Sequence, residues 1–543
     1  MKTNLRFFAS AGAIVLAMMT YSCQKAIDAT EKAKVIINYD LIETIIDIQL
    51  VDAHTGKLIG QEGDKTVTIS ITGPDREGVV DITGYQPADM TFQSHHGFVA
   101  LGLVPDAAYK PTADNPVVFN MTAKTSGYIK TSQTVTLVST GRSMLKIDMV
   151  STANPPQGVD VAEENNVAQL VNGTVQNSVQ VNTPDRKAQL EIPEGLVMYD
   201  AGGTPLSGPI SVSVAHFDNT VEEAMTAFPG GMITGVSFQD GSAGDGMFFS
   251  AGLLAIEITD GSGRNAATFE NGNLLVTAAV GIQTYNPETG STVADGDEIP
   301  VWSYDENTGQ WTEEGMATIV GNSSGFEVST EISHLSYYNF DWFVGNVCYQ
   351  AATFIFTADV PICDCFTLSG VMRRQVDNSF VQNVYMWVCD GEPVYTSYAP
   401  QGIPVFIEWN EYAYSGVQVS AVHQPTFIPD LCTNVPIEID LVTTGATDVL
   451  EIEVEVYCAA NPNVIIRPSF SVWYCLSGTY NWQLASMTNG EATICDIQIG
   501  ADYDVGIYYQ NNWYQTTVTV DQSSYQLIDF ELPADVCSEV FGY

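Results

Sequence analysis

Residues Thr66 to Gly73 read TVTISITG, and polar and apolar side chains alternate along this stretch. Successive side chains of a β-strand point to opposite faces, so the pattern predicts a strand with one buried and one solvated face. The same alternation recurs in ISVSVAHF (Ile210 to Phe217), EIEVEVY (Glu451 to Tyr457) and TTVTVD (Thr516 to Asp521). Turn segments such as TGPD, DGSG and PETG separate these stretches.

Helical periodicity is short after the first 22 residues. Only VEEAMTAF (Val221 to Phe228) is expected to form one or two helical turns. The sequence therefore predicts an all-β chain of tandem β-sandwiches.

The N-terminus has the order of charges and apolar residues that is typical of a secretory signal peptide. Lys2 and Arg6 precede an apolar run from Phe7 to Thr20, which is shorter than the roughly 20 residues that a bilayer-spanning helix needs. Ser22 then precedes Cys23, and this pair resembles the cleavage site of bacterial lipoproteins, in which the cysteine becomes the acylated N-terminus. Ordinary signal-peptidase cleavage is the alternative. We expect Cys23 to be lipidated.

The chain is strongly acidic, with 19 Lys and Arg against 64 Asp and Glu and a net charge of −45. Such a surface repels nucleic acid and anionic lipid, because both need cations to displace their counterions. The acidic residues are spread along the chain, which favours a role in solubility. No segment matches an EF-hand loop, so we expect no metal and no cofactor.

Cysteines gather in the last third of the chain, as expected of a protein in an oxidising compartment. Their number is odd without Cys23, so at most four disulfides form and one thiol remains, with the pairing left open. The disulfide candidates are Cys348, Cys363, Cys365, Cys389, Cys432, Cys458, Cys475, Cys495 and Cys537.

Composition divides the chain into a signal peptide and four β domains. A linker rich in Pro, Gly and acids (153–166) follows the first domain, and the cysteine-free region ends near residue 348. VYMWVCDG (384–391) can be aligned with FSVWYCLSG (470–478), which places Trp387 on Trp473 beside a cysteine in each copy and suggests core packing against a disulfide. The expected ranges are 1–22, 23–152, 153–345, 346–448 and 449–543.

The last domain resembles the carboxypeptidase regulatory-like, or prealbumin-like, β-sandwich. Thr488, Gly490, Gly500 and Tyr503 match the turn and Gly-x-x-Tyr elements of that family. The first domain shows a fainter version, and the central region resembles segments of Bacteroidota envelope proteins. These resemblances imply Ig-like or prealbumin-like sandwiches, but turn and packing residues carry no chemistry.

Candidate catalytic residues are few. GNSSG (Gly321 to Gly325) matches the nucleophile pattern G-x-S-x-G around Ser323, and His334 follows, but strand-like residues after the motif favour a turn over a nucleophile elbow. His95 and His96 are expected to face opposite sides of a strand. The remaining histidines (His54, His216, His423) are isolated, and Glu451, Glu453 and Glu455 share one face of a strand that is expected to lie at a solvated edge.

YYQNNWYQ (Tyr508 to Gln515) is the candidate ligand contact, because its asparagines favour a turn that presents aromatic rings. Asn511, Asn512, Trp513 and Tyr514 would there contact a glycan or a protein. The alternative is a hairpin that packs its own tip.

Together these features predict a non-catalytic, lipid-anchored protein of the outer membrane. It would act as a surface-exposed interaction or structural module that binds a glycan or an envelope or host protein, with the last two domains projecting away from the membrane. The alternatives are a scaffold that faces the periplasm and a secreted esterase or glycosidase that uses Ser323 and His334 or a pair of acids.

Overall fold

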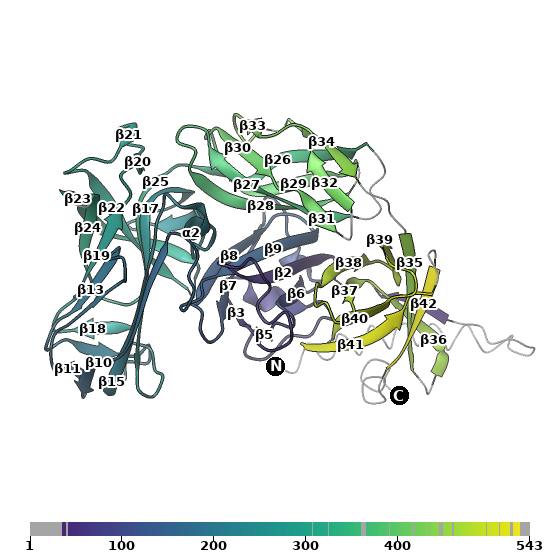
Figure 1. Cartoon of the computed structure of the whole chain (residues 1–543), viewed down its shortest axis with the longest axis horizontal. Helices are drawn as coiled ribbons and strands as arrows, with labels where there is room; N and C mark the ends of the chain where they lie inside the picture. Colours follow the sequence, from purple (N-terminus) through teal and green to yellow (C-terminus); the bar gives the residue numbers. More distant parts are fainter. Residues whose placement is uncertain are drawn as a thin grey trace, which may run out of the picture.

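The computed structural model describes residues 35–532 except for short gaps at 40–41, 307, 324, 360–364, 390, 415–416, 434, 445–448, 459–460, 496, 510 and 522–524. Cys23 and the expected signal peptide lie outside the described residues. Strands dominate, as predicted, and they form four units (Figure 1). The described helical segments are α2 (Glu222–Thr226), which confirms the expected short helix, and the 3-10 turns η1 (Arg76–Gly78) and η2 (Ala107–Tyr109).

The first sandwich packs two four-stranded sheets, β4-β6-β2-β9 and β5-β3-β7-β8. The alternation in TVTISITG produces β3, in which Ile69 and Ile71 face the core, so that prediction is confirmed. The strands are β2 (Thr44–Asp52), β3 (Thr68–Thr72), β4 (Val79–Asp81), β5 (Thr91–Gln93), β6 (Phe98–Leu103), β7 (Val117–Lys124), β8 (Thr131–Leu137) and β9 (Gly141–Met149).

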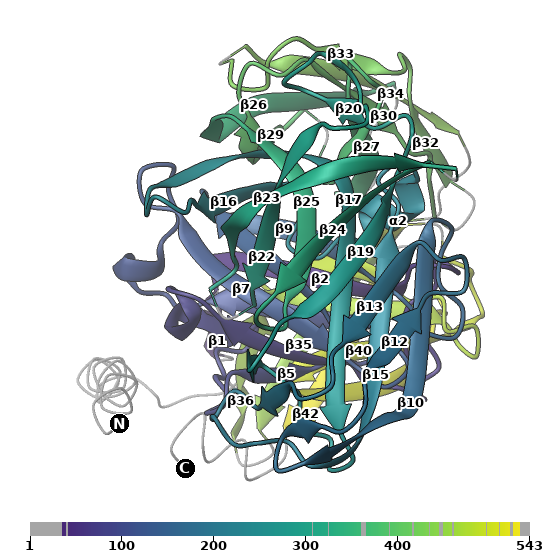
Figure 2. The same cartoon turned by 90° about the vertical axis from the view of Figure 1, so that its left-hand side faces the viewer.

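The central domain is built on a 14-stranded sheet that folds back on itself, so that β13 packs on β15 and β17 on β19 (Figure 2). Its strands are β10 (Val159–Val171), β11 (Thr174–Val175), β12 (Val179–Asn182), β13 (Ala188–Ile192), β14 (Val197–Tyr199), β15 (Gly208–Phe217), β16 (Ile233–Ser237), β17 (Ala243–Asp260), β18 (Thr268–Glu270), β19 (Leu274–Val280), β22 (Glu298–Asp305), β23 (Gln310–Asn322), β24 (Gly325–Ile332) and β25 (Tyr337–Val344), with a separate hairpin of β20 (Tyr285–Asn286) and β21 (Ser291–Thr292).

The third unit is a sandwich of sheets β29-β26-β34-β32-β31 and β28-β27-β30-β33. Its strands are β26 (Val347–Ala358), β27 (Phe366–Arg374), β28 (Phe380–Val388), β29 (Pro393–Pro400), β30 (Val405–Trp409), β31 (Tyr412–Tyr414), β32 (Val417–Ala421), β33 (Thr426–Ile428) and β34 (Ile437–Thr444).

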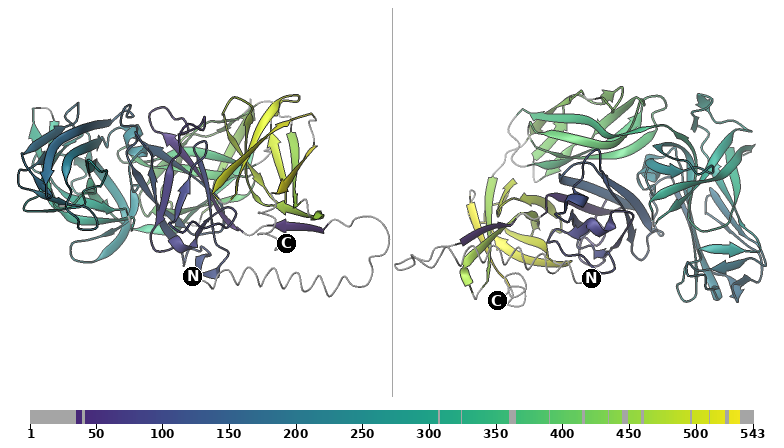
Figure 3. Two further views of the ribbon diagram at one scale, coloured as in Figure 1. Left: turned by 90° about the horizontal axis from the view of Figure 1, so that it is seen from below. Right: turned by 180° about the vertical axis from the view of Figure 1, so that it is seen from behind.

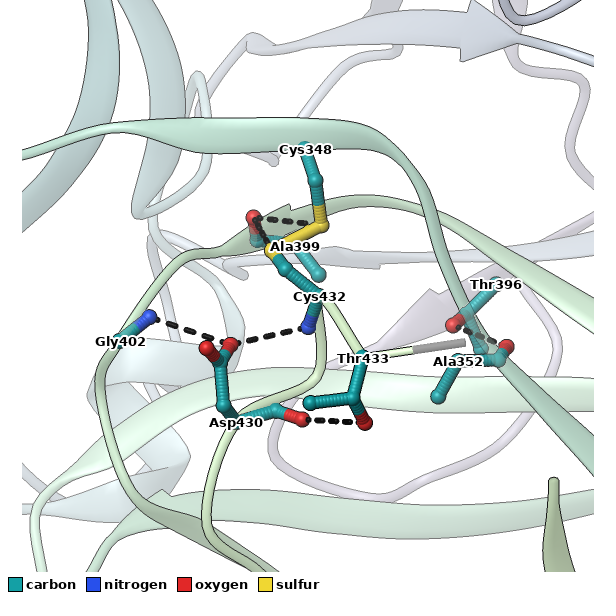
Figure 4. Close-up of a disulfide and its surroundings, with 8 residues drawn as sticks. All are labelled: Cys348, Ala352, Thr396, Ala399, Gly402, Asp430, Cys432 and Thr433. Atoms are coloured by element: carbon teal, nitrogen blue, oxygen red, sulfur yellow. Dashed lines mark hydrogen bonds between the residues drawn. A yellow bond between two sulfur atoms is a disulfide. The ribbon is translucent and has the colours of Figure 1, made fainter. Parts of the chain in front are cut away.

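Two disulfides, Cys348–Cys432 and Cys365–Cys389, brace the third sandwich. Both sulfur atoms of the first lie 3.7 Å from the carbonyl oxygen of Ala399, and Asp430 accepts hydrogen bonds from the backbone N–H groups of Gly402 and Cys432 (Figure 4). The two disulfides close loops of 84 and 24 residues. Each disulfide stabilises the fold by about 2–4 kcal/mol.

One sheet of the last sandwich includes β1, a strand that precedes the first sandwich in the sequence. β1 (Val35–Tyr39) lies parallel to β36, with Val35 opposite Val464, so the sheet runs β1-β36-β35-β39 with β42 on the other side of β35 (Figure 3). The first domain was expected to begin at residue 23, but β1 belongs to the sheet of the last sandwich and not to the first sandwich. The other strands are β35 (Val449–Cys458), β36 (Asn461–Pro468), β37 (Phe470–Leu476), β38 (Gln483–Met487), β39 (Glu491–Cys495), β40 (Asp502–Tyr509), β41 (Asn512–Thr519) and β42 (Tyr525–Leu532).

One strand order recurs in the three sandwiches. The first and last strands of each sandwich are parallel neighbours (β2 and β9, β26 and β34, β35 and β42). The opposite sheet has its four strands in the order second, first, third, fourth, so its first strand (β3, β27 or β37) lies between its second and its third. This equivalence matches β27 with β37. The expected alignment of Trp387 with Trp473 is therefore wrong, because Trp387 lies on β28 and Trp473 on β37.

The units do not form a linear stack. The first sandwich lies in the middle of the molecule and contacts the other three, with the central domain on one side and the last sandwich on the other (Figure 1). The last two domains therefore do not form a separate distal pair, because the contacts described below hold the last sandwich against the first. Their direction relative to the membrane stays a prediction.

Removing β1 should weaken the last sandwich, because β36 would lose its parallel ladder and become an edge strand. In a chain that begins at residue 42, we expect faster amide hydrogen exchange in Asn461–Pro468 than in a chain that begins at residue 24. Exchange in β27 of the third sandwich is the internal control. Equal protection of β36 in the two chains would contradict the pairing.

Candidate functional site

A buried ion pair in the first sandwich joins three units. Asp47 on β2 is 2% exposed, and its Oδ2 lies 3.0 Å from Nη1 of Arg142 on the neighbouring β9. Ser471 of the last sandwich donates a 2.7 Å hydrogen bond to the other carboxylate oxygen, and the Arg142 guanidinium lies 5.6 Å from the ring centre of Trp387 in the third sandwich. Burial raises the pKa of Asp47, while Arg142 and Ser471 oppose that shift.

The hairpin expected to present a ligand-binding tip packs against the first sandwich. Its Trp513 ring lies 5.3 Å from those of His96 and Trp482 and 5.2 Å from that of Tyr508. Tyr508 OH accepts a 2.8 Å hydrogen bond from the His95 backbone N–H and donates to the Phe98 carbonyl oxygen. Aromatic rings at these distances contribute about 0.5–1.5 kcal/mol per pair beyond their burial.

Two of the four candidate residues of this hairpin face the first sandwich, and the other two are exposed. The Asn511 backbone N–H donates to Asp81 Oδ2 (2.8 Å), and its side-chain oxygen accepts from the Gln93 N–H (3.1 Å), so Asn511 and Trp513 face the first sandwich. Asn512 and Tyr514 are exposed, Tyr514 by 47%. Ligand contact at the tip stays a prediction, and these two side chains are the most exposed of the four.

His95 and His96 lie on the same side of the chain, against expectation. His96 and Gly97 form a tight turn with φ values of 52° and 84°, so the alternation of a strand does not apply to them. Both rings contact Trp513. Burial lowers the pKa of His95, and the charge of His96 lowers it further.

Ser323 and His334 do not form a catalytic pair among the described contacts. Ser323 is exposed in the turn between β23 and β24, which confirms the turn interpretation. The His334 ring hydrogen-bonds Tyr338 OH (2.6 Å) and lies 3.4 Å from Glu314, and no described contact joins it to Ser323. Among the described residues, no three His, Cys, Asp or Glu side chains are grouped to hold a metal ion.

The remaining histidines stand apart from one another. His54 and His423 are exposed, whereas His216 is buried, with its Nε2 2.9 Å from the Ala279 carbonyl oxygen.

The cysteines outside the two described disulfides do not all share one environment. Cys475 is a free, buried thiol and not a disulfide partner, and burial raises its pKa to about 12, which keeps it protonated. Trp473 beside it is fully buried and contacts neither of the two described disulfides, whereas Trp387 is half-buried. Cys458 and Cys495 lie on strands β35 and β39. Cys363 and Cys537 lie outside the described residues.

The glutamate row on β35 is not at a sheet edge. β35 is flanked by β36 and β39 on one side and by β42 on the other. Arg467 on β36 forms ion pairs with Glu453 and Glu455, and Glu455 is 6% exposed. The expected role in guarding an edge is therefore wrong.

Sequence reasoning missed the Asp47 contact. Arg142 is 95 positions and Ser471 is 424 positions away from Asp47, so no local motif marks them.

The described part of the chain contains no helix that is long and apolar enough to span a membrane.

Replacing Trp513 should destabilise the junction between the first and last sandwiches. We expect Trp513→Ala to lower the free energy of unfolding by about 1–3 kcal/mol, because a half-buried ring with several aromatic neighbours is lost. Tyr514→Ala, one position along and exposed, should change it by about 0.5 kcal/mol or less. Urea unfolding measures both, and equal effects would contradict the packing.

Acidification should weaken the same junction through His95. Its folded-state pKa is lowered, so between pH 7.5 and 5.5 the unfolded chain takes up a proton that the folded chain resists, and stability falls. His95→Gln should remove this part of the pH dependence, as measured by urea unfolding at both pH values. The same loss of stability in the variant and the wild type would show that His95 does not contribute.

Comparisons with known proteins yield structures with little overall similarity, and no family model and no curated protein sequence matches. Matching structures include the shaft pilin SpaA of Lactobacillus rhamnosus GG (9% identity, TM-score 0.17, 34% of this chain and 100% of that chain). Others are the major pilin subunit BcpA of Bacillus cereus (10%, 0.14, 74% and 99%) and the Bacillus anthracis TIE protein (10%, 0.14, 69% and 74%). At these TM-scores none carries an argument, and the assignment of tandem β-sandwiches rests on the sheets described above.

Proposed function

We propose that this chain is a non-catalytic, lipid-anchored envelope protein of the Bacteroidota type that serves at the cell surface as an interaction and structural module. The observation that carries the proposal is the packing of the other three units around the first sandwich, with the Arg142–Asp47 pair joining the first, third and last sandwiches. Such an assembly presents large fixed surfaces. The separation of Ser323 from the His334 hydrogen bonds supports a role without catalysis.

Lipidation of Cys23 would set the orientation of the molecule. The residues between Cys23 and Val35 span at most about 40 Å when fully extended. Because β1 lies in the sheet of the last sandwich, that sandwich would stand near the membrane and the central domain at the far end (Figure 3). The surface offered to partners then includes the central domain and the third sandwich, and not the last one alone.

Protease treatment of intact cells tests anchoring and orientation together. We expect proteinase K to digest the wild-type chain on whole cells, and Cys23→Ala to appear in the soluble fraction. Trypsin is less suitable, because no Lys or Arg lies between Arg374 and Arg467. Cys475→Ala removes the buried free thiol and is the matched control, which should remain bound to cells.

Two results would overturn parts of the proposal. Cys23→Ala that stays with the membrane fraction would exclude the acyl anchor. A wild-type chain that resists the protease until the outer membrane is opened would exclude surface exposure and favour a scaffold facing the periplasm.

A further inference from the structure

A cleft of about 650 Å³ opens where three units meet. The first sandwich lines it with β8 and β9, the central domain with residues 230–235 and 308–310, and the third sandwich with β28 and β29. This volume lies in the usual range for ligand sites, which favour domain junctions. Because the three units are packed together, the cleft exists without a closing movement.

Charge is almost missing from this cleft, although the chain has a net charge of −45. Lys146 and Asp245 are the charged residues among those lining it, and both are engaged within the protein. Lys146 pairs with Asp148 at 2.7 Å, while Asp245 accepts hydrogen bonds from the Tyr349 and Tyr398 hydroxyls at 2.8 and 3.0 Å. A charged ligand would therefore find no free counter-charge.

Neutral hydrogen-bonding groups line the cleft instead. Gln133 on β8, Gln310 on β23 and Asn383 on β28 each carry an amide that makes no hydrogen bond to another described side chain or backbone group. Each amide offers two donors and an acceptor. The hydroxyls of Tyr385 and Tyr395 likewise make no described hydrogen bond, and Tyr395 is 53% exposed. Three units thus contribute residues with unused neutral donors and acceptors to the lining of one cleft.

We propose that this cleft binds a neutral oligosaccharide. This inference names the ligand class for the proposed surface function and rests on that function. Sugar hydroxyls supply paired donors and acceptors that match side-chain amides. The apolar faces of sugar rings pack on tyrosine rings, which carry an apolar body and a polar tip. A cleft without free charge disfavours anionic sugars and peptides with charged side chains.

Calorimetry on the purified chain from residue 24 onward tests the proposal. The probes are the neutral hexasaccharides of cellulose, starch, β-1,3-glucan, mannan and chitin, with hexagalacturonate as the anionic comparison. We expect at least one neutral probe to bind with a dissociation constant of about 1 mM or tighter. Its affinity should be unchanged between low and high salt, because screening acts on charges.

Matched variants locate the site. Tyr395→Ala should weaken binding about tenfold through the lost ring contact. Asn383→Leu should weaken it too, because the amide is replaced by a side chain of similar size without hydrogen-bonding groups. Tyr85→Ala removes a tyrosine of the first sandwich that is 41% exposed and lies outside the cleft, so it should leave binding unchanged. Thermal unfolding curves that match the wild type show that each variant is folded.

Three outcomes would overturn the proposal: no neutral probe binds, hexagalacturonate binds more tightly than all of them, or Tyr514→Ala weakens binding while Tyr395→Ala does not. The last outcome would place the site at the hairpin tip of the last sandwich. These measurements use soluble protein, so their failure is distinct from a failure of membrane anchoring or surface exposure, which the protease experiment reports without any ligand.

Discussion

The buried ion pair of Asp47 and Arg142 is the contact on which the arrangement of the molecule depends. It lies between the two parallel strands of the first sandwich, and each partner also reaches a different neighbouring unit. Removal of one member of such a pair leaves a charge away from water and destabilises a protein by about 3–5 kcal/mol. The stability of one domain and the placement of two others are therefore coupled at a single point.

Electrostatics explains why cations occur at the contacts between units. A chain with 64 acidic residues pushes its domains apart by self-repulsion. Arg142 and two further cations lie at such contacts: Lys130 of the first sandwich pairs with Glu306 of the central domain, and Arg373 of the third sandwich pairs with Glu222 of α2. Lys130 and Arg373 each neutralise an acid of a neighbouring unit, whereas Arg142 neutralises Asp47 of its own sandwich.

Sequence patterns predicted what is local and failed where distant segments meet. Alternation located β3 and its buried isoleucines, and the residues around Ser323 indicated a turn. The same alternation says which face of a strand is buried but not which strand lies beside it, so the pairing of β1 with β36 and the strand equivalence of Trp473 could not be predicted. The unpaired amides of the cleft come from three units, and no single stretch marks them.

The parallel pairing of β1 with β36 also constrains the order in which the protein folds. A ribosome produces β1 (Val35–Tyr39) long before β36 (Asn461–Pro468), so the sheet of the last sandwich cannot be completed until all the intervening domains have been made. Contacts between such distant segments carry a large loop-closure entropy and slow folding. Until they form, β36 presents an open edge, so this sandwich is the part of the molecule most dependent on protection from aggregation during biogenesis.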